Sequence, residues 1–269
     1  MDGDDELPQD SICLLVDKVS INTDMVVGNF IYKSKFHKRK NKELKEGQYE
    51  DELEFKSIQF KYDMFISNGR PLASVCNKLY SRKFLINNQI YFEEDVIAED
   101  RLFNLYCYCK YPNLTIVNRY TYIINQIEGS RSRSYIEDFY TLITNLTIKF
   151  HDFLCKNDTL EENKDLLFIN LVNDIEKIHR YIYKYSEKRS IDIKKYTILI
   201  KQNPLFNYIL KEGLTKEYFK KVRLNNKKWF LIIYVRLVIH LPQLILPYLQ
   251  VSNLALKIKT KIKSKKSIK

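Results

Sequence analysis

The feature that most constrains the fold of this chain is a change of hydrophobic pattern near residues 130–135. Before this point, residues 25–32 (MVVGNFIY) form a continuous apolar run typical of a buried strand, and residues 114–117 and 120–124 predict two further short strands. After it, apolar residues recur at helical spacing almost throughout, as in residues 168–185. The pattern therefore predicts an α/β domain followed by a mostly α-helical region.

The α/β domain is expected to cover residues 1–134. Helices are predicted between its strands, over residues 8–22, 81–88 and 98–110, because apolar side chains there recur every three or four positions. The chain has only 6 Gly and 6 Pro, which argues against a turn-rich all-β fold.

The net charge of +12 is unevenly distributed. The first ten residues carry five acids and no base, whereas residues 252–269 carry seven lysines and no acid. This basic tail predicts an anionic surface as a partner. The five cysteines lack the spacing of a disulfide framework or a zinc site, so we expect reduced thiols in a cytosolic setting.

An acidic cluster, Asp2-Gly3-Asp4-Asp5, opens the chain. Hard divalent cations such as Mg²⁺ and Mn²⁺ prefer oxygen ligands, and in nucleotide enzymes they bridge carboxylates to phosphates. The cluster is therefore a candidate metal site. Taken alone, it is more typical of a solvated chain terminus.

A second acidic pair, Glu99-Asp100, lies at the predicted start of the helix over residues 98–110. The helix dipole stabilises a carboxylate at this end, which suits a general base that must be deprotonated at neutral pH. Ordinary charge at a helix N-terminus, without any chemistry, is the alternative.

Taken in order, these motifs resemble the second half of a family 2 glycosyltransferase of the GT-A type. Residues 2–5 match its D-x-D-D loop, and residues 78–85 (KLYSRKFL) match its basic segment. Residues 99–104 (EDRLFN) match its E-D-x-L-F-N motif, and residues 129–132 (GSRS) match its G-S-x-S segment. Each motif is weak, and the resemblance rests on their order over residues 2–134.

The resemblance implies roles for the acidic residues. Asp4 and Asp2 would hold a Mg²⁺ or Mn²⁺ ion that bridges the diphosphate of a sugar nucleotide, and Asp5 would support this loop. Asp100 would be the general base that deprotonates the acceptor hydroxyl, and Glu99 would orient it or touch the acceptor.

The resemblance also places Lys78 and Arg82 near the sugar and phosphates, and Ser130 and Arg131 in a segment that covers the diphosphate. The first half of the family's domain has no counterpart here. We therefore expect a truncated chain that is weak or inactive by itself.

The second half of the chain is expected to form a helical accessory region over residues 135–228. Residues 229–251 are apolar and long enough to span a bilayer, but charged residues and prolines interrupt them. One interpretation is a membrane-surface helix anchored by the basic tail, so that residues 229–269 form an anchor. The other interpretation is a buried core helix.

The resemblance implies an inverting, metal-dependent glycosyltransferase with a partial GT-A (Rossmann-like) domain. It would move a sugar from a nucleotide-sugar donor to a saccharide or lipid-linked saccharide acceptor in cell-surface polysaccharide synthesis. It would act in the cytoplasm, at the inner face of the cell membrane. The alternative is a non-catalytic remnant that binds a membrane or a partner. No nucleic-acid partner is expected, because no nucleic-acid-binding module frames the Tyr and Lys residues near 181–185.

Overall fold

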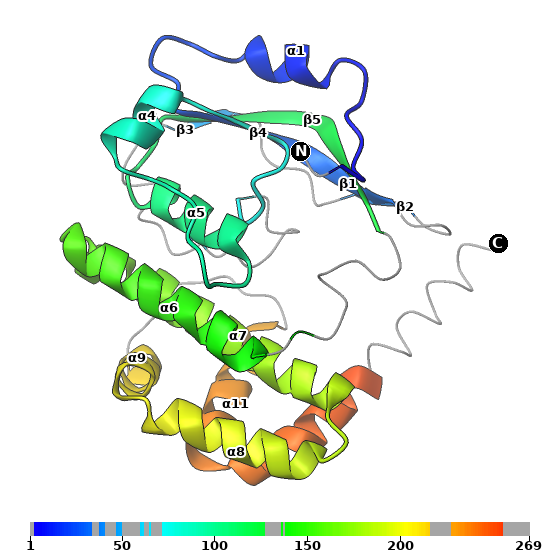
Figure 1. Ribbon diagram of the computed structural model, residues 1–269, viewed down its shortest axis with the longest axis vertical. Coiled ribbons are helices and arrows are strands. Elements are labelled where there is room, and N and C mark those ends of the chain that lie inside the picture. Colours follow the sequence, from blue (N-terminus) through cyan, green and yellow to red (C-terminus); the bar gives the residue numbers. More distant parts are fainter. Residues whose placement is uncertain are drawn as a thin grey trace. The chain divides into compact units, whose positions relative to one another are not determined.

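A computed structural model describes residues 3–33, 38–40, 47–49, 60–61, 65, 72–126, 136, 138–215 and 227–254. The chain forms two compact units, residues 1–169 and 170–269, which divide within the long helix α7 (Leu160–Tyr185) (Figure 1). From residue 138 onward every described element is a helix, as the change of pattern predicts. The domain boundary at residue 134 stays a prediction.

The first unit contains a mixed sheet. Its elements are α1 (Ser11–Val16), β1 (Met25–Lys33), β2 (Lys38–Lys40), β3 (Gly47–Tyr49), β4 (Lys78–Tyr80), α4 (Arg82–Asn87), α5 (Glu99–Tyr108), β5 (Leu114–Asn125) and α6 (Phe139–Lys156), followed by the start of α7. The strand order is β2-β1-β5-β3, with β4 paired to the first half of β1. β1 and β5 are parallel, and the other pairs are antiparallel. The predicted α/β fold class is confirmed.

The strand β5 corrects one expectation. The two short strands predicted at residues 114–117 and 120–124 are one strand of 12 residues. Its pairing with β1 shifts register around Asn29, and Asn118 meets that irregularity by accepting a hydrogen bond from Asn29 Nδ2 at 2.9 Å. Asn118 and Arg119 interrupt the apolar pattern, so the sequence suggests two strands where the backbone continues as one.

The two faces of the sheet carry different helices, with α1 on one side and α5 on the other (Figure 1). On the α1 side, Leu15 of α1 packs with Val26 and Val117, and Leu79 of β4 joins this cluster. Because side chains alternate along a strand, Lys78 and Tyr80 point to the opposite face, toward α5. This alternation positions the candidate site described below.

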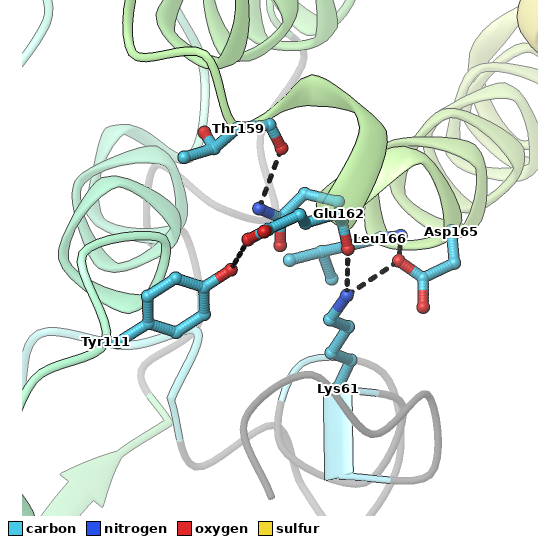
Figure 2. A network of polar contacts seen from close by, with 7 residues as sticks. Lys61, Tyr111, Thr159, Glu162, Asp165 and Leu166 are labelled. Carbon is cyan, nitrogen blue, oxygen red and sulfur yellow. Dashed lines mark hydrogen bonds and ion pairs between the residues drawn. The ribbon is translucent and has the colours of Figure 1, made fainter. Parts of the chain in front are cut away.

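Polar contacts tie the start of α7 to the rest of the first unit (Figure 2). Lys61, whose side chain is 1% exposed, donates to Asp165 Oδ1 at 2.8 Å and to the carbonyl oxygen of Glu162 at 2.6 Å. Tyr111 donates to the carboxylate of Glu162. A buried ammonium is stable only with such partners. The contacts of Lys61 therefore fix the position of the first turns of α7 within this unit.

The second unit consists of helices. It contains the rest of α7, then α8 (Arg189–Gln202), α9 (Pro204–Thr215), α11 (Lys227–His240), the 3₁₀ turn η2 (Pro242–Leu244) and a further helical stretch over residues 245–254. The predicted apolar stripe of α7 is confirmed, since Leu171, Ile175, Ile178 and Ile182 are buried. His179 bridges the unit's interior: its Nδ1 lies 2.5 Å from Tyr234 Oη and its Nε2 lies 2.9 Å from Thr197 Oγ1.

The apolar segment 229–251 is two helical pieces broken at Leu241 and η2. Tyr234, Val235 and Val238 of α11 are buried, as the core-helix interpretation predicts. Over the parts of the chain that the structure describes, no helix is both long enough and apolar enough to cross a membrane.

Candidate active site around Lys78 and Asp100

The candidate site is formed where β4 meets the first turn of α5. Tyr80 Oη donates to Asn104 Oδ1 at 2.7 Å, and Asn104 Nδ2 donates to the carbonyl oxygen of Asp100 at 2.9 Å. Residues i and i+4 of a helix are neighbours, so Asn104 links Asp100 to the strand. This link fixes the N-terminus of α5 against β4.

The start of α5 has an unusual backbone. Ala98, the N-cap residue, is in the left-handed region with φ 64° and ψ 47°, and no side chain caps the helix. Such a conformation costs an L-residue other than glycine about 1 kcal/mol or more. It turns the chain sharply into the helix, so that Glu99 is exposed while Asp100 is half-buried.

Burial dominates the electrostatics of Asp100. It raises the pKa of this carboxyl above its ordinary value, and Glu99 adds to the rise. The backbone N–H of Arg101, at 2.7 Å from Oδ1, and the charge of Lys78 lower the pKa by less. The expectation that the helix N-terminus controls this carboxylate is therefore corrected, because desolvation outweighs the backbone donor. A carboxylate with a raised pKa is a stronger base, which suits proton transfer.

Lys78 lies close enough to Asp100 for the two charges to interact. Burial lowers the pKa of its ammonium to about 7, while Cys76 and Asp100 favour the charged form. The ammonium donates to the carbonyl oxygen of Ser74, to Asn77 Oδ1 at 3.2 Å and to the carbonyl oxygen of Cys76 at 3.3 Å. In this arrangement Lys78 holds the loop before β4. Its predicted role near the sugar and phosphates stays a prediction.

Burial keeps two neighbouring groups, Cys107 and Tyr80, in their neutral forms. Burial raises the pKa of the Cys107 thiol to about 12 and raises the pKa of Tyr80 well above its usual value. Cys107 is therefore a thiol at neutral pH and a poor nucleophile. Within this site, the pKa of Lys78 is lowered to about 7 and the pKa of Asp100 is raised above its ordinary value.

The acidic cluster near the start of the chain is attached to the sheet. Glu6 forms an antiparallel bridge with Ile123 of β5, and its carboxylate lies 2.6 Å from Lys33 Nζ at the end of β1. Asp5 accepts a hydrogen bond from the backbone N–H of Asn125, the last residue of β5, at 2.8 Å. The cluster thus lies at the carboxyl ends of two parallel strands, where α/β sheets bind ligands.

Among these acids, Asp4 is the one available for a ligand. Its side chain is exposed, and within the described residues no group pairs with its carboxylate. Asp2 lies outside the described residues, and the described ones contain no group of three or more His, Cys, Asp or Glu that could hold a metal. Asp4 therefore fits as one oxygen ligand, and the predicted ion needs Asp2 or phosphate oxygens beside it.

Of the predicted residues Arg82, Ser130 and Arg131, the structure describes Arg82. Arg82 is exposed on the first turn of α4 and has no described contact with either acidic group. Ser130 and Arg131 lie outside the described residues. Asp4 and Asp100 share no described contact, although both belong to the first unit.

Two residues of the site carried no predicted role. Tyr80 and Asn104 fall inside the motifs KLY and EDRLFN, and their mutual hydrogen bond joins the two motifs. Their spacing in the sequence is a signal that could have identified them. Tyr80 is two residues after Lys78 and so on the same face of the strand, and Asn104 is four residues after Asp100 and so on the same face of the helix.

Comparison with known proteins locates the fold. No family model matches the chain, and no curated protein matches it in sequence. Among solved structures, it is similar to S. aureus TarS residues 1–349 in complex with UDP-GlcNAc, with a TM-score of 0.51 and 16% identity over 88% of this chain and 65% of that one. A longer structure of S. aureus TarS matches with a TM-score of 0.43 and 15% identity over 90% of this chain and 38% of that one.

The fold of the chain is thus similar to that of TarS residues 1–349. In this chain, that fold is a mixed sheet with helices, followed by a helical region. The chain spans 65% of the length of the TarS 1–349 structure that it resembles.

Proposed function

We propose that this protein is an inverting glycosyltransferase of family 2. It would transfer a sugar from a nucleotide-sugar donor to a saccharide or lipid-linked saccharide acceptor in cell-surface polysaccharide synthesis. The observation that carries the proposal is the half-buried Asp100 carboxylate, with its raised pKa, at the N-terminus of α5 in a glycosyltransferase fold. The UDP-GlcNAc bound to TarS supports a nucleotide-sugar donor.

In this proposal Asp100 accepts the proton of the acceptor hydroxyl. The acceptor oxygen then forms a bond to the anomeric carbon of the sugar while the bond to the diphosphate breaks on the opposite side, which inverts that carbon. The nucleoside diphosphate leaves with the electron pair of the broken bond. The link from Asp100 through Asn104 to Tyr80 holds the base in place during this step.

Asp4, together with Asp2, is proposed to hold a Mg²⁺ or Mn²⁺ ion. Such an ion neutralises the charge that develops on a leaving diphosphate. The support is the exposed carboxylate of Asp4 beside the carboxyl ends of β1 and β5. Arg82, Ser130 and Arg131 are proposed to contact the donor's phosphates.

The test is donor turnover by the purified chain. UDP-GlcNAc and a panel of other nucleotide sugars are incubated with the protein and Mn²⁺, and release of nucleoside diphosphate is measured. Asp100→Asn should lower the rate roughly 100-fold or more, the size of a general-base effect. Asp95→Asn is the matched control, because Asp95 is an exposed carboxylate in the loop that precedes α5. Equal rates for the two variants would remove Asp100 from the mechanism.

A second candidate role, attachment to an anionic membrane surface, is favoured by α8. Residues 191, 194, 195, 198 and 199 are related by steps of three or four positions and therefore share one face of this helix. Ile191 is 65% exposed and Ile198 is 42% exposed, and the lysines between them are exposed as well. Apolar side chains framed by lysines are typical of helices that lie on anionic lipid.

Vesicle co-sedimentation tests this second role. The chain should bind vesicles rich in phosphatidylglycerol more strongly than phosphatidylcholine vesicles, and the variant I198D/L199D should lose that binding. Ile12→Asp is the control, since Ile12 is an exposed apolar residue on α1. Unchanged binding by I198D/L199D would show that α8 is not the contacting surface.

A further inference from the structure

A cavity of about 500 Å³ lies in the first unit, away from Asp100. It is bounded by the chain that follows α4, the end of α5 and the C-terminal half of α6. Its lining contains four amide side chains, three lysines, two acids and three aromatic rings. The volume lies within the range of about 300–1,000 Å³ found for ligand pockets.

The charges of the cavity are not balanced. Lys149 is paired with Glu93 at 2.8 Å. Lys110, by contrast, contacts neutral groups: Asn157 accepts its hydrogen bond, and its Nζ lies 5.7 Å from the centre of the Phe153 ring. Lys156 is exposed, and no carboxylate among the described residues pairs with either Lys110 or Lys156. Asp152 also lines the cavity, so three lysines stand against two carboxylates and the lining keeps an excess of one positive charge.

The uncharged part of the lining suits a saccharide. Tyr106 and Phe153 are stacked with ring centroids 4.1 Å apart, and Tyr91 at the rim is 64% exposed. Flat aromatic rings pack against the C–H faces of sugars, while amides donate to and accept from sugar hydroxyls. Asn88 and Gln89 on one side and Asn157 on the other supply such amides.

Beside the cavity, the residue after Tyr91 packs on α5. Phe92, next to Tyr91, is 55% exposed and stacks on Phe103 with centroids 4.3 Å apart. Phe103 is three residues after Asp100 and thus on the same side of α5. Tyr106, which lines the cavity, lies about 9 Å further along the helix axis than Asp100, at 1.5 Å per residue. Tyr91 and Phe92 are thus two exposed aromatic rings, one lining the cavity and the other packed on α5.

We propose that this cavity binds a negatively charged saccharide, as an extension of the acceptor site. Lys110 and Lys156 bind its carboxylate or phosphate groups. Tyr91 and Phe92 pack against the sugar units that extend from the cavity toward Asp100. The direction toward Asp100 rests on the proposed function, whereas binding in the cavity does not.

Isothermal titration calorimetry without any donor tests the binding. The probes are an oligogalacturonate, a phosphate-bearing oligosaccharide of similar length, and the same oligogalacturonate with its carboxyl groups reduced to alcohols. One or both acidic probes should bind at least about tenfold more tightly than the neutral one, as expected for charge-assisted hydrogen bonds. Comparing the two acidic probes identifies which anion is preferred. Equal affinity for all three, or no binding of either acidic probe, would overturn the proposal.

Variants assign the binding to the cavity. K110M/K156Q should weaken binding of the preferred acidic probe about tenfold or more, and Lys211→Gln, an exposed lysine on α9, should not. Thermal melting verifies that each variant is folded, and Lys156→Gln alone is a second test, because Lys156 is exposed. Wild-type affinity in both Lys156→Gln and the double variant would refute the site. Asp100→Asn should lower sugar transfer roughly 100-fold or more and keep probe binding, so that failure of the catalytic proposal is distinguishable from failure of this one.

Discussion

Gly28 of β1 lies directly against Thr121 of β5: a Cβ atom at residue 28 would be 2.1 Å from Thr121 Oγ1 and 2.9 Å from its Cγ2. Both residues lie in the central parallel pair of the sheet, near the shift of register. Thr121 is fully buried and cannot move into solvent. This contact sets how closely the two strands approach beside the loop that Lys78 holds.

The variant Gly28→Ala should therefore be destabilised. Forcing a methyl group into this contact should lower the free energy of unfolding by about 1–3 kcal/mol, the usual cost of overpacking. Urea unfolding measures the change. The double variant G28A/T121A should recover part of the loss, because it removes the two atoms that clash most. Independent, additive effects of the two substitutions would contradict this account.

The buried pair of Lys61 and Asp165 should be costly to break from one side. Lys61→Met leaves the carboxylate of Asp165, 11% exposed, without its cation, and should cost about 3–5 kcal/mol. The variant K61M/D165L, which removes both charges, should be more stable than K61M. Glu161→Gln is the control, because Glu161 is 78% exposed in its pair with Lys164 and should cost under about 1 kcal/mol. Equal losses in K61M and E161Q would show that burial of the pair contributes nothing.

His179 should make stability depend on pH. Burial lowers its pKa from 6.5 to about 3, so the unfolded chain binds one proton more than the folded chain between these values. The stabilisation is fully present above about pH 7 and is lost as pH falls. Between pH 7 and 5.5, the free energy of unfolding should drop by about 1 kcal/mol through this group. His179→Gln should flatten the profile, whereas His240→Gln, at an exposed histidine, should leave it unchanged.

The left-handed backbone of Ala98 predicts a stabilising substitution. Glycine adopts φ 64° without strain, so Ala98→Gly should raise the free energy of unfolding by about 1 kcal/mol. Ala73 lies outside the left-handed region, and Ala73→Gly should be neutral or destabilising. Thermal unfolding measures the stability of both variants. A loss of stability in Ala98→Gly would contradict the prediction that the left-handed backbone of Ala98 is strained.

Local patterns predicted the elements that carry the site. The apolar run at residues 25–32 became β1, and the helices expected at residues 81–88 and 98–110 became α4 and α5, with Ser81 capping α4. These predictions succeeded because burial on one face imposes its period on the sequence. The electrostatics of Asp100 was not predictable in this way, since its desolvation depends on tertiary packing.

Contacts between distant segments could not be predicted from the sequence either, because they too depend on tertiary packing. The cavity beside Lys110 gathers residues from three elements that are up to 70 positions apart in sequence, from Asn87 to Asn157. Its lysines and amides are individually unremarkable, and only the fold brings them together.

The central claim, that Asp100 is the base of an inverting sugar transfer, is tested most directly by following the reaction by proton NMR. A nucleotide sugar and a saccharide acceptor are incubated with the wild-type chain and with Asp100→Asn, and the anomeric configuration and rate of product formation are recorded. The account predicts a product of inverted configuration and a rate in the variant that is lower by roughly 100-fold or more. A product of retained configuration, or an undiminished rate in Asp100→Asn, would contradict it.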